Sequence, residues 1–306
     1  MRIGATSRRL TRILAVAALA TCIGLASNSA ASAQAPDCAG RGVPDSKISI
    51  QLWTFAEYIG FEEDEATIAR TEEVFSRLSE MGYRNVEPFT LSGLSANDYR
   101  ALLDEYGLSA SARHVNVGTP EEPVDFEQIL EDNATLGIKF FGSGATPDYE
   151  TEAEWIAYAE YLNELGELAR QRGQTLMVHN HNWEFQRVFG DRTAFDILVE
   201  HTDPKNVAFQ VDLYWATNGG ADPVELLERY GDRVQLFHVK DMAAGTFPGR
   251  IEIVGEGIID FPTIFAAAQG PVRYYVVEHD PRFDDPSFDP FEAAEKGFDY
   301  LDCVTF

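Results

Sequence analysis

Four apolar runs in the second half of the chain each end in a side chain that commonly binds metal ions. The runs are Leu176-Met177-Val178-His179, Phe209-Gln210-Val211-Asp212, Leu236-Phe237-His238 and Tyr275-Val276-Val277-Glu278. Such runs, each followed by turn residues and a helical pattern, predict buried parallel strands. In a closed barrel of parallel strands the C-terminal ends meet at one mouth, where active sites lie. Two imidazoles and two carboxylates there predict a nitrogen/oxygen site for a divalent cation.

The whole chain after residue 45 alternates strand and helix patterns without an internal linker. Strands are expected at 48–53, 83–87, 108–114, 139–141, 175–179, 207–212, 234–240 and 274–278. Helices are expected at 65–81, 95–106, 125–136, 152–172, 192–201, 223–230, 261–269 and 290–302. Eight alternations predict a single (β/α)8 TIM barrel over residues 46–306. An open doubly wound sheet is disfavoured, because Thr54-Phe55-Ala56-Glu57 follows the first strand instead of a glycine-rich phosphate loop.

The first 33 residues have the pattern of a secretory signal peptide. Four arginines precede an apolar stretch at 13–26, and Ala31-Ser32-Ala33 is a small-residue cleavage signal that places cleavage before Gln34. A leader at 34–45 would then precede the barrel. Ser7-Arg8-Arg9-Leu10 weakly resembles a twin-arginine export signal. We therefore expect a periplasmic or secreted protein that has no membrane association after cleavage.

The charge balance excludes several classes of partner. Removal of residues 1–33 takes four arginines and no acid from a chain with 24 basic and 50 acidic residues, which gives a net charge of −30. Such an acidic surface disfavours nucleic acid and anionic membranes, and it offers no general affinity for phosphorylated substrates. The charge keeps the protein soluble but does not identify its substrate.

Two cysteines survive the expected cleavage, Cys38 near the new N-terminus and Cys303 near the end. An exported protein folds in an oxidising compartment, and the termini of a barrel lie near each other, so a disulfide between them is one expectation. Two unpaired thiols on loosely ordered ends are the alternative.

Side-chain alternation gives the four ligand candidates consistent directions. His179 and His181 share one face of their strand, and His238 and Lys240 share one face of theirs. A single strand-end histidine is more often a hydrogen-bonded core residue, and a strand-end aspartate often caps the next helix. Four such residues at equivalent positions of four successive strands favour the metal site.

Four segments resemble the xylose-isomerase-like TIM-barrel superfamily. They are HNHNWEF at 179–185, VDLYW at 211–215, HVKDM at 238–242 and VGEG at 254–257. The superfamily contains sugar phosphate isomerases/epimerases, tagatose-type epimerases and inosose dehydratases, and the likeness runs from about Ile48 to Leu301. The resemblance implies a Mn²⁺, Co²⁺, Mg²⁺ or Zn²⁺ ion at Asp212, His238 and Glu278, and a homodimer. The motifs specify the superfamily but not a substrate.

Position 179 departs from the epimerase pattern. In the epimerases this position is a glutamate, which exchanges protons with the sugar from the face opposite a second glutamate, while the metal holds the substrate oxygens. Here His179 leaves Glu278 as the only member of that pair, so His181, Glu184 or Lys240 would have to act on the other face. A one-base route, either isomerisation through a cis-enediol or β-elimination, is easier to build. The histidine is closer to the dehydratase branch.

Further side chains at the expected mouth are candidates for binding the substrate. Acids and imidazoles there would bind sugar hydroxyls or relay a proton, and indole rings would stack on the sugar's apolar face. The alternatives are an arginine ion pair for Glu87, packing over the barrel rim for the indoles and a solvated loop position for Glu184. For Glu256 the alternative is a supporting contact behind the substrate-binding residues. The substrate-binding candidates are Glu87, His114, Trp53, Trp183, Glu184, Trp215 and Glu256. Lys240 is expected either to pair with Asp241 or Glu256 or to contact an enolate oxygen.

These observations favour a divalent-metal-dependent sugar isomerase or epimerase that removes a proton α to the carbonyl of an unphosphorylated keto-sugar or polyol. The expected catalytic residues are Glu278, His181 and Lys240, and the expected metal ligands are His179, Asp212, His238 and Glu278. A β-elimination lyase or dehydratase acting on a 3-keto-glycoside or inosose is the first alternative. A non-catalytic periplasmic sugar-binding protein is the second. Export and the acidic charge disfavour a DNA-repair endonuclease on the same barrel.

Overall fold

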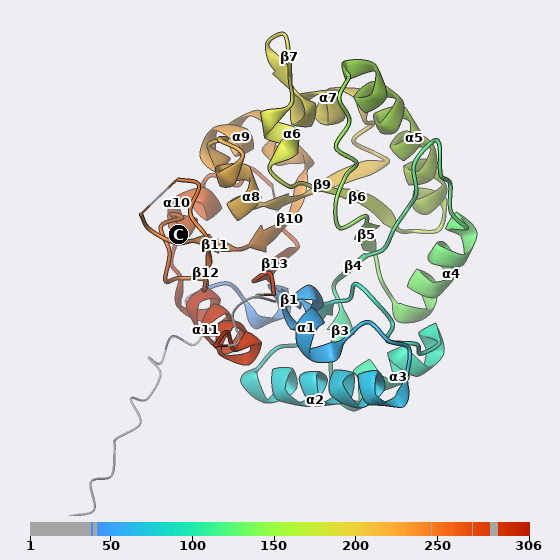
Figure 1. Cartoon of the computed structure of the whole chain (residues 1–306), viewed down its shortest axis with the longest axis vertical. Coiled ribbons are helices and arrows are strands. Elements are labelled where there is room, and N and C mark those ends of the chain that lie inside the picture. The colour runs from blue at the N-terminus through green and yellow to red at the C-terminus, as the bar shows by residue number, and fades with distance from the viewer. Residues whose placement is uncertain (1–37, 39–41, 246, 271, 282–286) are drawn as a thin grey trace, which may run out of the picture. The chain divides into compact units, whose positions relative to one another are not determined.

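A computed structural model describes residues 38, 42–245, 247–270, 272–281 and 287–306 of the chain (Figure 1). The expected signal peptide and most of the expected leader lie outside the described residues. Within the described residues, no helix combines the length and the apolar character that crossing a membrane requires.

Nine parallel strand segments form the sheet at the centre of the fold (Figure 1). Their order is β3-β2-β1-β13-β10-β9-β6-β5-β4. β3 and β4 are consecutive pieces of one strand, because only Ser111 separates them, and its backbone N–H still donates to Val86 O at 2.9 Å. Since β3 pairs with β2 and β4 pairs with β5, the ring returns to its start with eight strands. The bounds are β1 (Ile48–Gln51), β2 (Asn85–Glu87), β3 (Ser109–Ala110), β4 (Ala112–His114), β5 (Phe140–Gly142), β6 (Thr175–His179), β9 (Val207–Asp212), β10 (Val234–Val239) and β13 (Tyr274–Val277).

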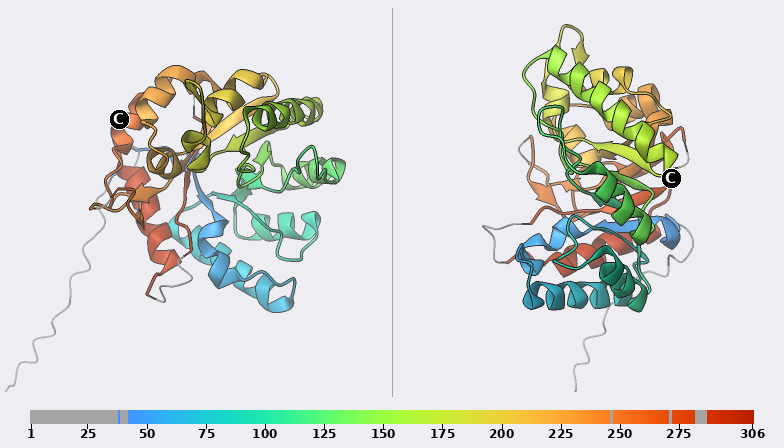
Figure 2. Two further views of the ribbon diagram at one scale, coloured as in Figure 1. Left: turned by 45° about the horizontal axis from the view of Figure 1, so that its top comes forward. Right: turned by 90° about the vertical axis from the view of Figure 1, so that its right-hand side faces the viewer.

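Helices lie around the outside of these strands, as Figure 2 shows. α5 begins with a capping box, in which Thr151 and Glu154 satisfy each other's backbone N–H groups. α2 ends at Gly82, whose φ of 110° is readily adopted by glycine. The α-helices are α1 (Ala56–Ile59), α2 (Glu65–Met81), α3 (Ala96–Glu105), α4 (Phe126–Leu136), α5 (Glu152–Gln171), α6 (Trp183–Gln186), α7 (Ala194–His201), α8 (Leu213–Asn218), α9 (Pro223–Tyr230), α10 (Phe261–Ala266) and α11 (Pro290–Cys303).

The predicted TIM barrel is confirmed, with differences at the ends of some elements. The first strand stops at Gln51, because its side-chain oxygen accepts from Trp53 N and starts a 3₁₀ turn over Leu52–Phe55. The seventh barrel strand stops at Val239, which leaves Lys240 just beyond it. Two small hairpins were not expected from the sequence. They pair β7 (Val188–Phe189) with β8 (Arg192–Thr193) and β11 (Asp241–Met242) with β12 (Ile251–Glu252).

A disulfide joins the beginning and the end of the barrel domain. Cys38 and Cys303 are bridged across a sequence separation of 265 residues, with their Cα atoms 4.9 Å apart. Nearby, Val43 N donates to Leu301 O at 2.8 Å. α11, which ends at Cys303, contacts β1 and β13. The bridge therefore ties the two ends of the chain to the region where the barrel ring joins its first and last strands.

Replacing both cysteines in C38S/C303S should lower the free energy of unfolding by about 2–4 kcal/mol, because the bridge restricts the unfolded chain over a very long loop. Urea denaturation followed by circular dichroism measures the change. A reductant should destabilise the wild-type protein but leave the double variant unaffected. Equal stability of the two proteins under oxidising conditions would show that the bridge contributes nothing.

Candidate active site

A cavity of about 490 Å³ lies over the C-terminal ends of the barrel strands. This is the end at which the sequence placed the active site. Six of the predicted site residues line the cavity: Trp53, His114, His179, His181, Lys240 and Glu278. The other lining residues are Phe89, Val115, Asn116, Ser143, Gly144, Ala145 and Asp280.

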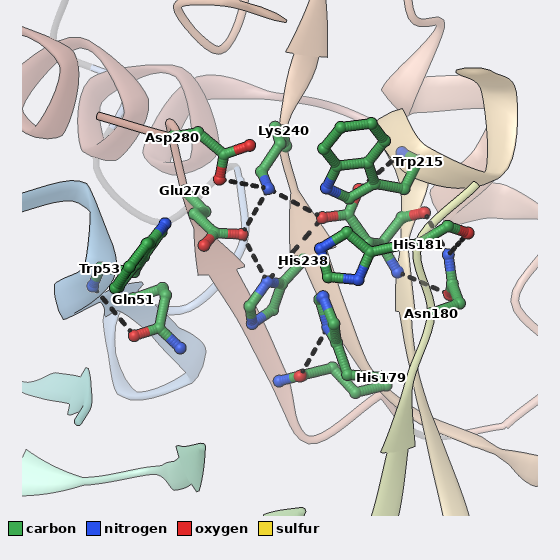
Figure 3. Close-up of polar contacts among 12 residues, drawn as sticks. Gln51, Trp53, His179, Asn180, His181, Trp215, His238, Lys240, Glu278 and Asp280 are labelled. Atoms are coloured by element: carbon green, nitrogen blue, oxygen red, sulfur yellow. Dashed lines mark hydrogen bonds and ion pairs between the residues drawn. The ribbon is translucent and has the colours of Figure 1, made fainter. Parts of the chain in front are cut away.

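Three carboxylates, one imidazole and one ammonium group form a cluster beside the cavity (Figure 3). All of them are buried except the partly exposed Asp280. Glu278 Oε2 lies 2.8 Å from both His238 Nδ1 and Lys240 Nζ. The same ammonium lies 3.2 Å from Asp212 Oδ2 and 3.0 Å from Asp280 Oδ1. Burial alone would lower the pKa of Lys240, but the three carboxylates outweigh burial and raise it. Lys240 is therefore a cation at neutral pH and pairs with Asp280, not with the expected Asp241 or Glu256.

The donor set of Asp212, His238 and Glu278 fits a divalent cation. One ligand atom from each lies within 4.8 Å of the others, and all three residues are buried. Asp212 Oδ2 is buried and accepts no hydrogen bond from the described residues, although the Lys240 ammonium is close. A buried carboxylate oxygen without a hydrogen bond calls for a further partner. One nitrogen and two carboxylate oxygens match the ligands preferred by the expected metals.

His179, the fourth expected ligand, belongs to a neighbouring cluster. Its imidazole groups with His114 and His238, and its Nδ1 lies 3.1 Å from Gln210 Oε1. The ring centroid of His179 is 4.5 Å from that of His238. The structure therefore brings His179 beside the predicted metal ligands but does not place it in one group with Asp212 and Glu278.

Glu87 lies beneath the cavity floor and does not line the cavity, where we expected it to bind the substrate. Its side chain is fully buried, and Oε1 lies 2.9 Å from both His114 Nε2 and His238 Nε2. Gln51 Nε2 donates to Oε1 at 2.6 Å, and Gln210 Nε2 donates to Oε2 at 2.7 Å. Burial would raise the pKa of Glu87, but the two imidazoles outweigh burial and hold the pKa low. The ionised carboxylate therefore orients side chains from four other strands.

His238 is held between two carboxylates through its two ring nitrogens. Nε2 bonds to Glu87 and Nδ1 bonds to Glu278. Burial would lower the pKa of His238, but these carboxylates outweigh burial and raise it to about 10. Both ring nitrogens therefore carry protons at neutral pH. An imidazole binds metal only through an unprotonated nitrogen, so a cation would take the place of the Nδ1 proton while Nε2–H stays on Glu87.

His181 is supported from behind by aromatic and polar contacts. Its ring stacks on Trp183 with centroids 4.5 Å apart and planes 4° apart, and its centroid lies 5.1 Å from that of Trp215. Burial, aided by the nearby Lys240 charge, lowers the pKa of His181 to about 3. Nδ1 of His181 is buried without a hydrogen-bond partner among the described residues. His181 is thus a neutral imidazole with a nitrogen free to bind.

Glu184 lies at the start of α6, three residues after His181. Its side chain is buried and does not line the cavity. Its carboxylate accepts from the backbone N–H of His181 at 2.9 Å and from the hydroxyl of Thr146. Trp183 Nε1 donates to the same hydroxyl at 3.0 Å. Burial raises the pKa of Glu184 to about 7. Glu184 and Trp183 therefore hold the His181 loop in place, whereas the sequence had suggested contacts with the substrate.

Glu256 lies away from the cavity, contrary to the expectation of a substrate contact. Its half-exposed side chain pairs with Lys296 on α11 at 2.8 Å. The turn around it is fixed by the neighbouring backbone, since the N–H groups of Gly255 and Gly257 both donate to Asp241 Oδ2 at 3.0 Å. The turn therefore shapes the rim of the barrel, and Glu256 is on its outer side.

Several site residues were not identified from the sequence. Gln51 and Gln210 orient the buried imidazoles, and Asp280 pairs with Lys240. Phe89 lines the cavity. Asp280 was accessible to sequence reasoning, because it stands two residues after Glu278 and side chains alternate along a strand. Glutamines at strand ends give no comparable signal.

The sequence profile described as Xylose isomerase-like TIM barrel matches residues 75–302. The chain belongs to this family. Inosose dehydratase of Geobacillus kaustophilus is 27% identical over 232 residues, which are 64% of this chain and 74% of that protein. A crystal structure of a sugar phosphate isomerase/epimerase from Parabacteroides distasonis superposes with a TM-score of 0.68 and 26% identity, covering 85% of this chain and 94% of that one.

A further solved structure, the IOLI protein with a bound zinc atom, has the same fold. It superposes with a TM-score of 0.63 over 84% of this chain and 98% of its own, at 16% identity. The family and the relatives of this chain therefore place it among sugar-modifying TIM-barrel enzymes. One of the structural neighbours, the IOLI protein, holds a metal ion.

Replacing Glu87 should weaken metal binding without touching a ligand, because the carboxylate fixes the Nε2–H of His238 and so directs Nδ1 to the cation. We expect E87A to lower the affinity for Zn²⁺ about 10- to 100-fold, and the volume-conserving E87Q to lower it less. Competition with a chromophoric chelator measures the affinity. E184Q is the matched control, since Glu184 is equally buried but does not contact His238. Wild-type affinity in E87A would contradict this role.

Glu184 should make stability depend on pH. Its folded pKa of about 7 exceeds the ordinary value of 4.5, so the folded protein retains a proton that the unfolded chain releases. The retained proton on Glu184 adds about 3 kcal/mol to the free energy of unfolding. This stabilisation is complete below pH 4.5 and is lost as the pH rises to about 7. E184Q cannot ionise, so its free energy of unfolding should fall less than that of wild type between pH 4.5 and 7.5. Urea denaturation at several pH values measures these free energies. An equal dependence of the free energy of unfolding on pH in wild type and E184Q would refute this assignment.

Proposed function

We propose that this protein is a divalent-cation-dependent enzyme that removes a proton α to the carbonyl of a neutral keto-sugar or cyclitol ketone and then expels a β-oxygen substituent. The observation that carries the proposal is the convergence of Asp212, His238 and Glu278, whose ligand atoms lie within 4.8 Å of one another. Glu278 also lines the cavity. The names of the inosose dehydratase relatives support the elimination outcome. The name of the structural relative supports isomerisation or epimerisation, which is the second candidate.

The cation would be held by Asp212 Oδ2, His238 Nδ1 and a Glu278 oxygen. A divalent ion bound there would polarise the substrate carbonyl and so acidify the neighbouring C–H bond. The chain itself keeps the ligands in position before any ion arrives, since Glu87 anchors His238 and Lys240 balances the two carboxylates.

In this proposal Glu278 is the base. Its contacts with His238 and Lys240 all use Oε2, and Figure 3 draws no contact from its other oxygen. In the proposed reaction this carboxylate takes the α-proton, the C–H electron pair forms the new C=C bond, and the β C–O bond breaks. The Lys240 ammonium lines the cavity and gives a proton to the departing oxygen, which leaves as water or an alcohol. The 2.8 Å contact between Lys240 and Glu278 then returns the captured proton.

The charge of the cavity supports a substrate without phosphate. Among the described residues that line the cavity, Lys240 is the one lysine or arginine, and it is already paired with three carboxylates. A phosphate dianion would meet no free cationic side chain and would be repelled by Glu278 and Asp280. Neutral hydroxyls and a carbonyl suit the imidazoles and amides of this wall, including His114, His181 and Asn116.

Position 179 supports elimination over epimerisation. Epimerisation needs a second acid or base on the opposite face of the substrate. His179 lies where the epimerases have that glutamate, and its Nδ1 is engaged with Gln210. Burial together with the charge of His238 holds the pKa of His179 well below its usual value. A neutral imidazole is a poor proton donor, whereas elimination requires only Glu278 and Lys240.

The decisive experiment supplies Mn²⁺-loaded protein in D₂O with inosose and, separately, with methyl 3-keto-glucoside. We expect loss of the α-proton signal in NMR spectra together with a new enone absorbance. E278Q should slow both about 10²- to 10⁴-fold, because the base is lost. K240M should slow the enone signal more than the proton exchange. E256Q, an acid outside the cavity, is the control and should keep wild-type rates.

The outcomes separate the candidates. Proton exchange without enone or alcohol release would favour isomerisation or epimerisation. Sugar binding without exchange in any metal-loaded sample would favour a non-catalytic binding protein and would overturn the proposal. The proposed export to the periplasm or medium is tested separately, by N-terminal sequencing of the mature protein, which should begin at Gln34.

A further inference from the structure

An aromatic strip leads from the cavity to the protein surface. Trp53 and Phe89 both line the cavity, and their ring centroids are 5.1 Å apart in an edge-to-face arrangement. Phe61 contacts the Trp53 ring at a centroid distance of 5.9 Å and does not line the cavity. The Phe61 side chain is 62% exposed. Trp53 therefore contacts both the cavity and an aromatic ring that is exposed to solvent.

The position of Phe61 is not explained by packing. It lies between α1 and α2 in the sequence Gly60-Phe61-Glu62-Glu63-Asp64, and the four residues after Gly60 are all exposed. Asp64 caps α2, so the fold fixes where this segment ends. A large apolar side chain that stays in water beside two carboxylates gains little from burial, whereas a ligand that covers it would gain.

We propose that Phe61 and the adjoining edge of Trp53 form an outer subsite for a ring-shaped aglycone, so that the substrate is a glycoside and not a free monosaccharide. This inference rests on the proposed function, because it assumes that the keto-sugar ring occupies the cavity. The substituent of that ring would then extend past Trp53 onto Phe61. Glu62 and Glu63, the next two residues, are exposed, and carboxylates there would accept hydrogen bonds from the hydroxyl groups of such a ligand.

The small area of the strip argues against a protein partner. A stable protein interface covers about 800 Å² on each side. In the segment 60–66, Phe61 is the single exposed large apolar side chain. One phenyl ring with flanking carboxylates, continuous with a cavity that holds the reacting groups, matches a small ring ligand. A sugar or aryl ring can place its flat face on Phe61 while its polar edge meets the acids.

The test compares phenyl and methyl β-glucosides by isothermal titration calorimetry on the full, metal-loaded protein. Wild type should bind the phenyl glucoside more tightly. F61A should weaken that binding about 3- to 10-fold, as expected for one aromatic contact, and change methyl glucoside binding by less than twofold. F61W should restore the preference. F247A is the matched control, because Phe247 is also 62% exposed but lines a different cavity.

Each result bears on one proposal at a time. An equal affinity of wild type for the two glucosides, or an unchanged phenyl preference in F61A, overturns the outer subsite. Neither measurement needs turnover, so a failure of proton exchange in D₂O would overturn the proposed reaction and leave the subsite standing. A loss of phenyl preference in F247A as well as F61A would show a general effect of removing surface phenylalanines and would also refute the subsite.

Discussion

The site depends on one buried negative charge, the carboxylate of Glu87. It contacts side chains from four other strands and is closed off from solvent. A buried carboxylate is costly unless it is fully paired, so the surrounding strands are held to the register that pairs it. His238 transmits this constraint to the cavity, because its second nitrogen meets Glu278. The buried polar side chains around Glu87 thus position His238 and, through it, Glu278 at the cavity.

The barrel could be predicted because its signals are local and repeated. Apolar strands, capped helices and intervening turns recur along the chain. In such a barrel the active site lies at the C-terminal ends of the strands, so its location can be predicted from the strand order alone. Asp212, His238 and Glu278 were predicted together because each ends an apolar run in the sequence. In the structure Asp212 and His238 are paired in register, and Glu278 lies just beyond the end of β13. The broken third strand was not predicted, since the interruption at Ser111 follows from pairing with two neighbours and not from its own residue type.

The roles of individual side chains were harder to predict, because they depend on depth below the mouth. Glu87 and His114 end adjacent strands, yet His114 lines the cavity and Glu87 does not. Glu184 and Trp183 follow a strand end, but the short helix α6 turns them away to support His181. Gln51 and Gln210 become important only once they face histidines from other strands. Long-range pairs of this kind leave no mark in a single sequence.

The position of Lys240 has a consequence for the stability of the barrel in the absence of a cation. The ammonium group lies beside carboxylate oxygens of Asp212 and Glu278, the acids that would bind a metal, and so relieves the repulsion between them. A cation would therefore add positive charge to carboxylates that are already partly neutralised, while Lys240 keeps Asp280 as a third partner. The barrel would therefore fold with these acids already neutralised, and a cation would find its ligands assembled without any rearrangement of the strands.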